Sequence, residues 1–165
     1  MADAREEFSA YIRKYEKSMY AAAYGILKND RDIADVVQDA ILKAYTHLDT
    51  LENPDKFRPW IMKIVHNTAI AYIRKRHDEI DIDTQAEILP DSDAPVDSET
   101  KITVWNAVGM LKEAHRTVII LFYYEGCSVR EIAAITSSAE TTVRVRLLRA
   151  RKELASILKK EDFER

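Results

Sequence analysis

Cysteine, glycine and proline are scarce in this 165-residue chain, which has one cysteine, three glycines and four prolines. A single cysteine excludes a disulfide framework and favours a reducing compartment. So few glycines and prolines argue against a loop-rich all-β chain or a collagen-like one. No hydrophobic signal segment follows Met1, and no apolar run approaches the roughly 18 residues of a membrane span. We therefore expect a soluble, cytoplasmic protein without membrane insertion.

The sequence patterns of enzymes and metal sites are also missing. The four histidines are scattered without metal-ligand spacing, and three glycines cannot build a phosphate-cradling loop. Cys127 precedes a helix start, where the pKa of a thiol can be lowered, but no histidine lies beside it in the sequence. A small buried residue is the better interpretation of Cys127. We predict no catalytic residue, no metal and no cofactor.

The net charge of −3 is the sum of segments whose charges have opposite signs. Residues 1–76 carry a net charge of +2 and residues 101–165 a net charge of +4, whereas residues 77–100 carry −9 with no lysine or arginine. This acidic stretch also contains Pro90 and Pro95 and is poor in aromatic residues, which is typical of a flexible linker. It is either a solvated spacer or a competitor for a basic surface, and the sequence leaves both open.

Helical spacing of apolar residues dominates on both sides of the acidic stretch. The first part predicts helices near residues 8–27, 30–48 and 59–76. On the second of these, the polar face is expected to carry Asp32, Asp35, Gln38, Asp39 and Lys43. The second part predicts helices near residues 102–110, 116–124, 128–135 and 140–160.

The dense apolar run at residues 116–124 also fits a buried strand, but the sequence offers no second strand to pair with it. The expected fold is all-α, with two small helical domains at residues 1–77 and 101–165, and a flexible acidic linker at 78–100.

The C-terminal domain has the pattern of a helix-turn-helix. Ser128 and Glu131 have capping-box spacing, and a short break separates this helix from one with five cations within nine residues. In such units the second helix enters the major groove. Arg144 suits a guanine, and Thr141 or Val145 a thymine methyl group. Three other cations of this helix suit phosphates, which position the helix without specifying the sequence: Arg146, Arg149 and Lys152. The competing interpretation is a basic, solvated helix end.

The third predicted helix gives a weaker signal. It mixes cations, aromatic rings and an amide, in the set Trp60, Lys63, His66, Asn67, Tyr72, Arg74, Lys75 and Arg76. This mixture fits a platform for phosphates and unstacked bases. A purely structural role fits the spacing equally well, and Trp60 in particular suits the core.

Two stretches resemble the extracytoplasmic-function sigma factors, which are two-domain specificity subunits of bacterial RNA polymerase. The first is residues 32–45 (DIADVVQDAILKAY) with 57–60 (FRPW). The second is residues 111–116 (LKEAHR) with EIA at 131–133 and 142–151 (TVRVRLLRAR). The resemblance covers nearly the whole chain, except for the acidic stretch.

This resemblance implies a function and partners: the protein binds core RNA polymerase and directs transcription initiation at promoters. It implies contacts with double-stranded promoter DNA, with the melted non-template strand and with an anti-sigma factor. The polymerase-binding residues would be Asp35, Gln38, Asp39 and Leu42. The −10 element would contact the loop at residues 50–57, where Asn53 and Lys56 would capture a flipped base. The supporting contacts would be Lys63, Asn67, Arg74 and Arg76. The −35 element would contact Ser138, Glu140, Thr141, Arg144, Val145, Arg146, Leu148 and Arg149.

Some positions depart from the family pattern. Ser137 stands where a glycine is usual, and a positive φ there costs a non-glycine residue about 1 kcal/mol. Val145 replaces a common small polar residue, and the sequence Ile33-Ala34-Asp35 lacks one carboxylate. The alternative function is a polymerase-independent helix-turn-helix regulator with an N-terminal sensing or dimerisation domain.

Overall fold

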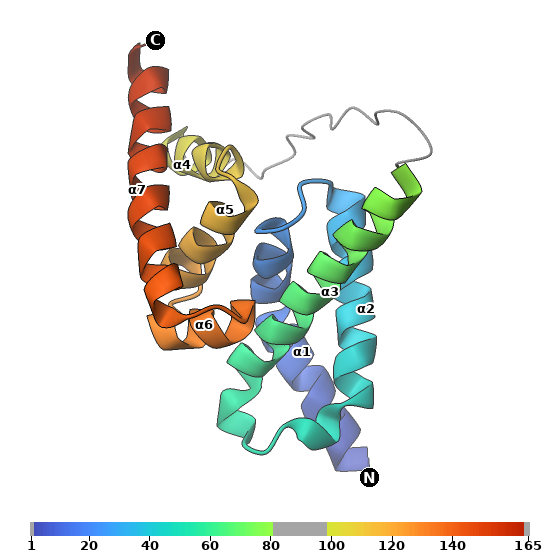
Figure 1. Cartoon of the computed structure of the whole chain (residues 1–165). Coiled ribbons are helices and arrows are strands. Elements are labelled where there is room, and N and C mark those ends of the chain that lie inside the picture. Colours follow the sequence, from blue (N-terminus) through green and yellow to red (C-terminus); the bar gives the residue numbers. More distant parts are fainter. Residues whose placement is uncertain (1, 81–98, 164–165) are drawn as a thin grey trace.

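The computed structural model describes residues 2–80 and 99–163, and within these ranges the chain forms helices and no strands. The N-terminal unit contains α1 (Ala2–Tyr24), α2 (Asp30–Thr46) and α3 (Phe57–Ile80), with short 3-10 turns at Leu48–Thr50 and Pro54–Lys56. The C-terminal unit contains α4 (Glu99–Gly109), α5 (Glu113–Ile119), α6 (Val129–Thr136) and α7 (Glu140–Phe163). A π-helical turn, Ile120–Tyr124, continues α5. Figure 1 shows the two units side by side.

The all-α prediction is confirmed, and so is the preference for helix over strand at residues 116–124. Several helix ends differ from the predictions, and three of them bear on the layout of the two units. The first helix ends at Tyr24, three residues early; the third continues to Ile80; and the fourth begins at Glu99. Most of the predicted linker at residues 78–100 lies outside the described residues.

The predicted apolar stripes form the core. In the N-terminal unit the three helices pack against one another, with Met19, Val36 and Ile61 among the fully buried side chains. In the C-terminal unit α7 packs on α4, α5 and α6. Residues of both units belong to one continuous hydrophobic cluster.

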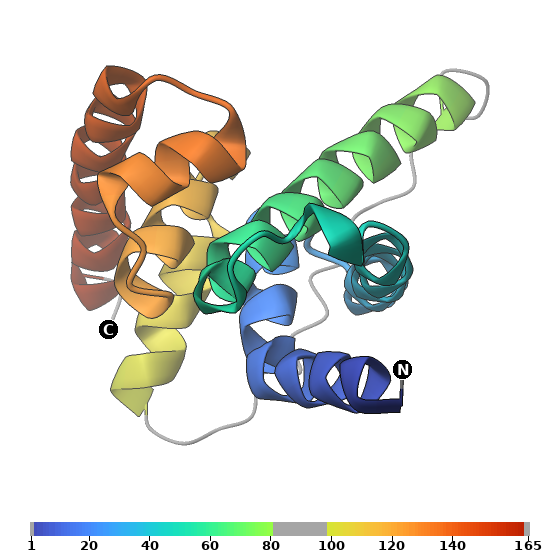
Figure 2. The ribbon, with the colours of Figure 1, turned by 90° about the horizontal axis from the view of Figure 1, so that it is seen from below.

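The two units meet along α1, α3, α6 and the π-helical turn. The π-helical turn contacts α1. α6 packs on α3, and Figure 2, seen from below, shows it beside the N-terminal half of that helix. The fold therefore places the helix-turn-helix directly beside the helix that carries the predicted −10 residues.

Candidate nucleic-acid interface

The helix-turn-helix begins with the predicted capping box. The backbone N–H of Glu131 donates to Ser128 Oγ at 3.0 Å, and the N–H of Ser128 donates to Glu131 Oε1 at 3.1 Å. α6 then ends at Thr136, and its C-cap residue Ser137 has a φ of 52°, in the left-handed region. A residue other than glycine is disfavoured there by about 1 kcal/mol. The position where the family usually has glycine thus does adopt a positive φ, and Ser137 bears that cost.

The outer face of α7 is open to solvent. Its buried stripe consists of Val143, Leu147 and Ala150. On the opposite side Val145 is 44% exposed and Leu148 is 53% exposed. The polar residues predicted on this face are also exposed: Glu140, Thr141, Arg144 and Arg149.

The cations of α7 are not equivalent. Arg144 forms an exposed ion pair with Glu140 at 3.5 Å, four residues earlier on the same face. Arg146 is partly buried and donates to Ser138 Oγ at 3.0 Å, so it reaches back over the turn. The Nε of Arg151 donates to the Tyr123 hydroxyl at 2.6 Å, and its guanidinium lies over that ring. Arg144, Arg149 and Lys152 all lie exposed on the helix, and of these only Arg144 forms an ion pair within the described residues.

A second candidate site is a cavity of about 250 Å³ between α2, the turn after it, and α3. It is lined by Lys43, His47, Thr50, Trp60, Lys63, Ile64 and Asn67. The Trp60 indole N–H donates to Thr50 Oγ1 at 3.1 Å, and Thr50 Oγ1 donates to His47 O at 2.7 Å. The cavity therefore combines an aromatic side chain held by hydrogen bonds with two lysines and an amide, which are groups that suit a base and its phosphate.

The predicted −10 residues divide between this cavity and its surroundings. Lys63 and Asn67 line it, whereas Asn53 and Lys56 lie exposed on the preceding loop. The side chain of Asn53 accepts from the N–H of Asp55 at 3.0 Å. Arg74 lies exposed farther along α3. The sequence placed Lys43 on the polar face of α2 but assigned neither Lys43 nor His47 to this site. Their spacing of four residues, with His47 capping the helix, puts both on the same side.

The polar face of α2 agrees with the prediction at four positions. Asp35, Gln38, Asp39 and Leu42 are all exposed, and Leu42 is exposed by 67%. The opposite face is buried, including Val36 and Ala40. A leucine held this far into solvent contributes little to the core, so the four residues form a surface available to a partner.

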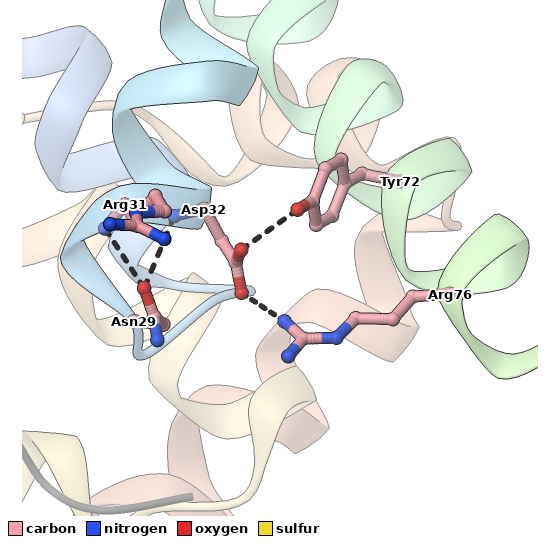
Figure 3. A network of polar contacts seen from close by, with 5 residues as sticks. All are labelled: Asn29, Arg31, Asp32, Tyr72 and Arg76. Carbon is pink, nitrogen blue, oxygen red and sulfur yellow. Dashed lines mark hydrogen bonds and ion pairs between the residues drawn. The ribbon is translucent and has the colours of Figure 1, made fainter. Parts of the chain in front are cut away.

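Asp32 does not lie on this exposed face, and that prediction is wrong. Asp32 is buried. It accepts a hydrogen bond from the Tyr72 hydroxyl at 2.7 Å and forms an ion pair with Arg76 (Figure 3). This hydrogen bond, followed by burial, raises the pKa of Tyr72. The side chain of Asn29, drawn in the same view, caps α2 by accepting from the backbone N–H groups of Arg31 and Asp32. Arg76, predicted to contact the −10 element, is engaged in fastening α3 to the start of α2.

We expect Asp32→Ala to lower the free energy of unfolding by about 2 kcal/mol, because the change leaves Tyr72 without its acceptor and Arg76 without its counterion. The loss of a carboxylate in the first turn of α2 adds to the effect. Urea unfolding followed by circular dichroism measures it. The matched control is Asp39→Ala on the exposed face of the same helix, which we expect to change stability by less than about 0.5 kcal/mol. Equal midpoints for the two variants would contradict a stabilising role for Asp32.

His66 and Cys127 have roles other than those of reactive groups. Burial, with the charge of Arg146 as a smaller cause, lowers the pKa of His66 to about 4, so the ring is neutral at pH 7. His66 thus lies near α7 and does not line the cavity beside Lys63. Cys127 is buried, and burial raises the pKa of its thiol in spite of the neighbouring Arg58. The interpretation of Cys127 as a small buried residue is confirmed.

Two further features bound the possible chemistry of residues 2–80 and 99–163. No helix there has both the length and the apolarity to cross a membrane. The same part of the chain contains no group of three or more histidine, cysteine, aspartate or glutamate side chains that could hold a metal ion.

Two protein families match this chain in the order of its two units. The family described as Sigma-70 region 2 matches residues 11–79, and Sigma-70, region 4 matches residues 102–154. The chain is 34% identical to RNA polymerase sigma factor SigV of Bacillus subtilis over 92% of its own length and 91% of that protein. It is 32% identical to the ECF RNA polymerase sigma-E factor of Escherichia coli K12, over 74% of the chain and 72% of that protein.

Solved structures with the same fold include a sigma factor in complex with an anti-sigma factor. The sigma factor RpoE of Bartonella quintana, in complex with the anti-sigma factor NepR, superimposes with a TM-score of 0.82 at 27% identity, over 93% of this chain and 98% of that one. CnrH, in complex with the cytosolic domain of CnrY, superimposes with a TM-score of 0.66 at 25% identity, over 94% and 90%. The match to RpoE is a single superposition that spans both units, so the two proteins share their relative placement of the units.

Proposed function

This chain belongs to the extracytoplasmic-function class of the sigma-70 family, and from this membership we propose which of its surfaces carry out each part of promoter recognition. As a sigma factor it binds core RNA polymerase, recognises promoter DNA and directs transcription initiation. The division of labour and the residue roles are our proposal. Residues 1–77 bind the polymerase and the −10 element, residues 101–165 bind the −35 element, and residues 78–100 link them.

The exposed face of α7 is the observation that carries the proposal. Val145 and Leu148 are apolar and solvent-exposed, and they lie among Glu140, Thr141, Arg144 and Arg149 on a helix held by a capped turn. This combination suits insertion into a major groove, where aliphatic side chains contact thymine methyl groups and an arginine contacts the edge of a guanine. Arg146 and Ser138, which are hydrogen-bonded to each other, support the turn beside the phosphates.

For the −10 element we propose that the cavity between α2 and α3 receives an unstacked base of the non-template strand. Trp60 provides an aromatic surface, Asn67 an amide, and Lys63 a cation. Asn53 and Lys56 lie on the adjoining loop and contact the same strand, as does Arg74 farther along α3. Arg76 acts through its ion pair with Asp32.

For polymerase binding we propose the exposed face of α2, with Asp35, Gln38, Asp39 and Leu42. A leucine surrounded by carboxylates and an amide suits a partner surface that is basic with an apolar centre. The chain itself supplies specificity, and we propose no catalysed reaction for it. We also propose a cytoplasmic location, where bacterial polymerase works, and an anti-sigma factor as a regulatory partner.

Transcription with purified components tests this function. The protein is mixed with core polymerase, and run-off transcripts are scored on genomic promoter fragments with and without it. We expect initiation at discrete sites only when both are present. If the protein binds palindromic sites tightly without polymerase and core gains no initiation, it is a polymerase-independent regulator instead.

Two asparagine variants test whether the base is captured in the cavity or on the loop. We expect Asn67→Ala to slow promoter melting about fivefold to tenfold, because the cavity loses one amide that hydrogen-bonds the base. Asn53→Ala should slow it less than twofold. Melting is followed by the fluorescence of 2-aminopurine placed in the −10 element. A larger loss with Asn53→Ala would assign base capture to the loop.

A further inference from the structure

His47 stands where α2 ends, and its ring lines the cavity between α2 and α3. α2 ends at Thr46, and His47 is its C-cap residue. The carbonyl oxygen of Lys43 accepts two hydrogen bonds from this one residue, from the backbone N–H of His47 at 3.0 Å and from the ring nitrogen Nδ1 at 2.9 Å. The imidazole is therefore fixed against the last turn of the helix. His47 is also exposed, so a ligand reaches it without any rearrangement of the fold.

The contact with Lys43 decides which ring nitrogen of His47 carries the proton. A carbonyl oxygen can accept a hydrogen bond but cannot donate one, so this contact assigns a proton to Nδ1. In the neutral imidazole the other nitrogen, Nε2, then has a lone pair and acts as an acceptor. Because Nδ1 is used at the end of α2, Nε2 is the ring nitrogen that remains for a ligand in the cavity.

The backbone of His47 is tied to the aromatic side chain of the same cavity. The carbonyl of His47 accepts from the Thr50 hydroxyl at 2.7 Å and from the Thr50 N–H at 2.9 Å. Thr50 Oγ1 in turn accepts from the indole N–H of Trp60 at 3.1 Å. This chain of hydrogen bonds joins α3 to the end of α2. The stacking surface of Trp60 and the acceptor of His47 are therefore held in one arrangement.

The other polar groups that line the cavity do not supply a fixed acceptor of this kind. Lys43 and Lys63 can only donate. The hydroxyl of Thr50 uses its proton on the carbonyl of His47 and already accepts from the indole. The amide of Asn67 offers both a donor and an acceptor, and turning the amide over exchanges them. His47 thus presents a ring nitrogen whose hydrogen-bonding character is set by the fold.

We propose that His47 is a specificity-determining residue of this cavity, whose Nε2 accepts a hydrogen bond from the exocyclic amino group of the captured base. The inference rests on the proposed function, in which the cavity receives an unstacked base. Cytosine and adenine carry an amino group at N4 and N6, whereas thymine carries a carbonyl oxygen, O4, at the corresponding place. A carbonyl that faces Nε2 sets two lone pairs against each other and leaves both groups unpaired. The cavity therefore prefers an amino base to a carbonyl base of the same size.

Binding to fork templates tests this preference. Each template has an upstream duplex and a single-stranded −10 element on the non-template strand, and the base at one position is changed in turn. Core polymerase with the full-length protein is titrated onto the labelled templates at pH 8, where an imidazole is mostly neutral. Fluorescence anisotropy gives the Kd. Two comparisons exchange an amino group for a carbonyl, cytosine against uracil and adenine against hypoxanthine. At one position we expect the amino base to bind about threefold to tenfold more tightly, the effect of one hydrogen bond.

A methylated base separates the amino group from the size of the base. 5-Methylcytosine has the methyl group of thymine and the amino group of cytosine. We expect it to bind as cytosine does at the selective position. If it binds as thymine does, the cavity distinguishes the methyl group, and the role of His47 as a reader of the amino group is wrong.

Two variants of His47 connect the preference to Nε2. His47→Asn removes Nε2 but keeps an amide N–H that can donate to the carbonyl of Lys43, so the end of α2 retains its contact. We expect the preference for the amino base to fall below twofold, while the Kd for the uracil template changes by less than twofold. His47→Phe keeps a ring without any nitrogen and should lose the preference in the same way. The matched control is His77→Asn, which changes an exposed histidine of α3 that does not line the cavity and should keep the full preference.

The outcomes separate this inference from the proposed function. Far-UV circular dichroism shows whether His47→Asn keeps its helices, and if it does not, His47→Phe decides. A preference that persists without Nε2 overturns the inference, because another group then reads the base. A wild type that binds every base equally at each position overturns it too, and in both cases normal initiation leaves the proposed function standing. A polymerase complex that binds no fork template and starts no transcript contradicts the proposed function and the inference together.

Discussion

Replacing Asp35 and Gln38 together by alanine is expected to reduce transcription by core polymerase about 100-fold at limiting concentrations of the protein. Both side chains are exposed on α2 and take no part in the core, so their loss acts on the partner rather than on folding. Central residues of an interface commonly contribute 2 kcal/mol or more, and partial loss of two such contacts accounts for the effect. Run-off transcription measures it, and fluorescence anisotropy of labelled protein reports binding to core directly.

The control for this double variant is Glu16→Ala with Lys17→Ala, two exposed residues on the side of a neighbouring helix. We expect that variant to transcribe as the wild type does. Both proteins should unfold at the same urea concentration as the wild type, within about 0.5 kcal/mol. If the α2 variant binds core and initiates normally, polymerase docks elsewhere on the molecule.

The second large effect concerns base recognition by α7. We expect Arg144→Ala to weaken transcription from a matched −35 element by 5-fold to 150-fold, because a bidentate contact with guanine contributes about 1–3 kcal/mol. The loss should fall on one base pair, so that promoters already altered at that position are little affected. The Glu140 partner of Arg144 is also exposed, and the ion pair between them adds little to stability.

Arg149→Ala provides the contrast. This arginine is exposed on the same helix, and as a phosphate contact it should weaken all −35 variants alike. It should also reduce the salt dependence of binding by about one ion. A panel of promoters with each −35 position changed in turn, measured at several salt concentrations, separates the two behaviours. Uniform weakening by Arg144→Ala would reassign that residue to the phosphates.

The local patterns of the sequence predicted the parts of the fold that depend on neighbouring residues. The capping box at Ser128 and Glu131 and the buried stripe of α7 both follow from interactions within a few residues. Such interactions are encoded in spacing, and spacing is visible without a structure.

The features that escaped prediction join residues far apart in the chain. Periodicity placed Asp32 on the polar face of its helix, but its partner Tyr72 is 40 residues away on α3. The cavity requires the relative rotation of α2 and α3, which brings Lys43 opposite Lys63. Arg116 reads as one more surface cation, because nothing in its neighbourhood reveals the carbonyls of α1, some 90 residues earlier. Helical spacing predicts which face of each helix is buried. It does not predict which other helix or side chain that face contacts.

The hydrogen bond from Arg116 of α5 to the carbonyl of Ile26, just after the end of α1, also bears on the order of events during synthesis. The carbonyl of Ile26 leaves the ribosome 90 residues before the guanidinium that will pair with it. At 5–20 residues per second, this interval lasts roughly 5 to 20 seconds. Until then this carbonyl of the nascent N-terminal unit is hydrated, and the surface meant for α5 stays uncovered. During the first seconds of synthesis, the contact between Arg116 and the end of α1 is therefore absent.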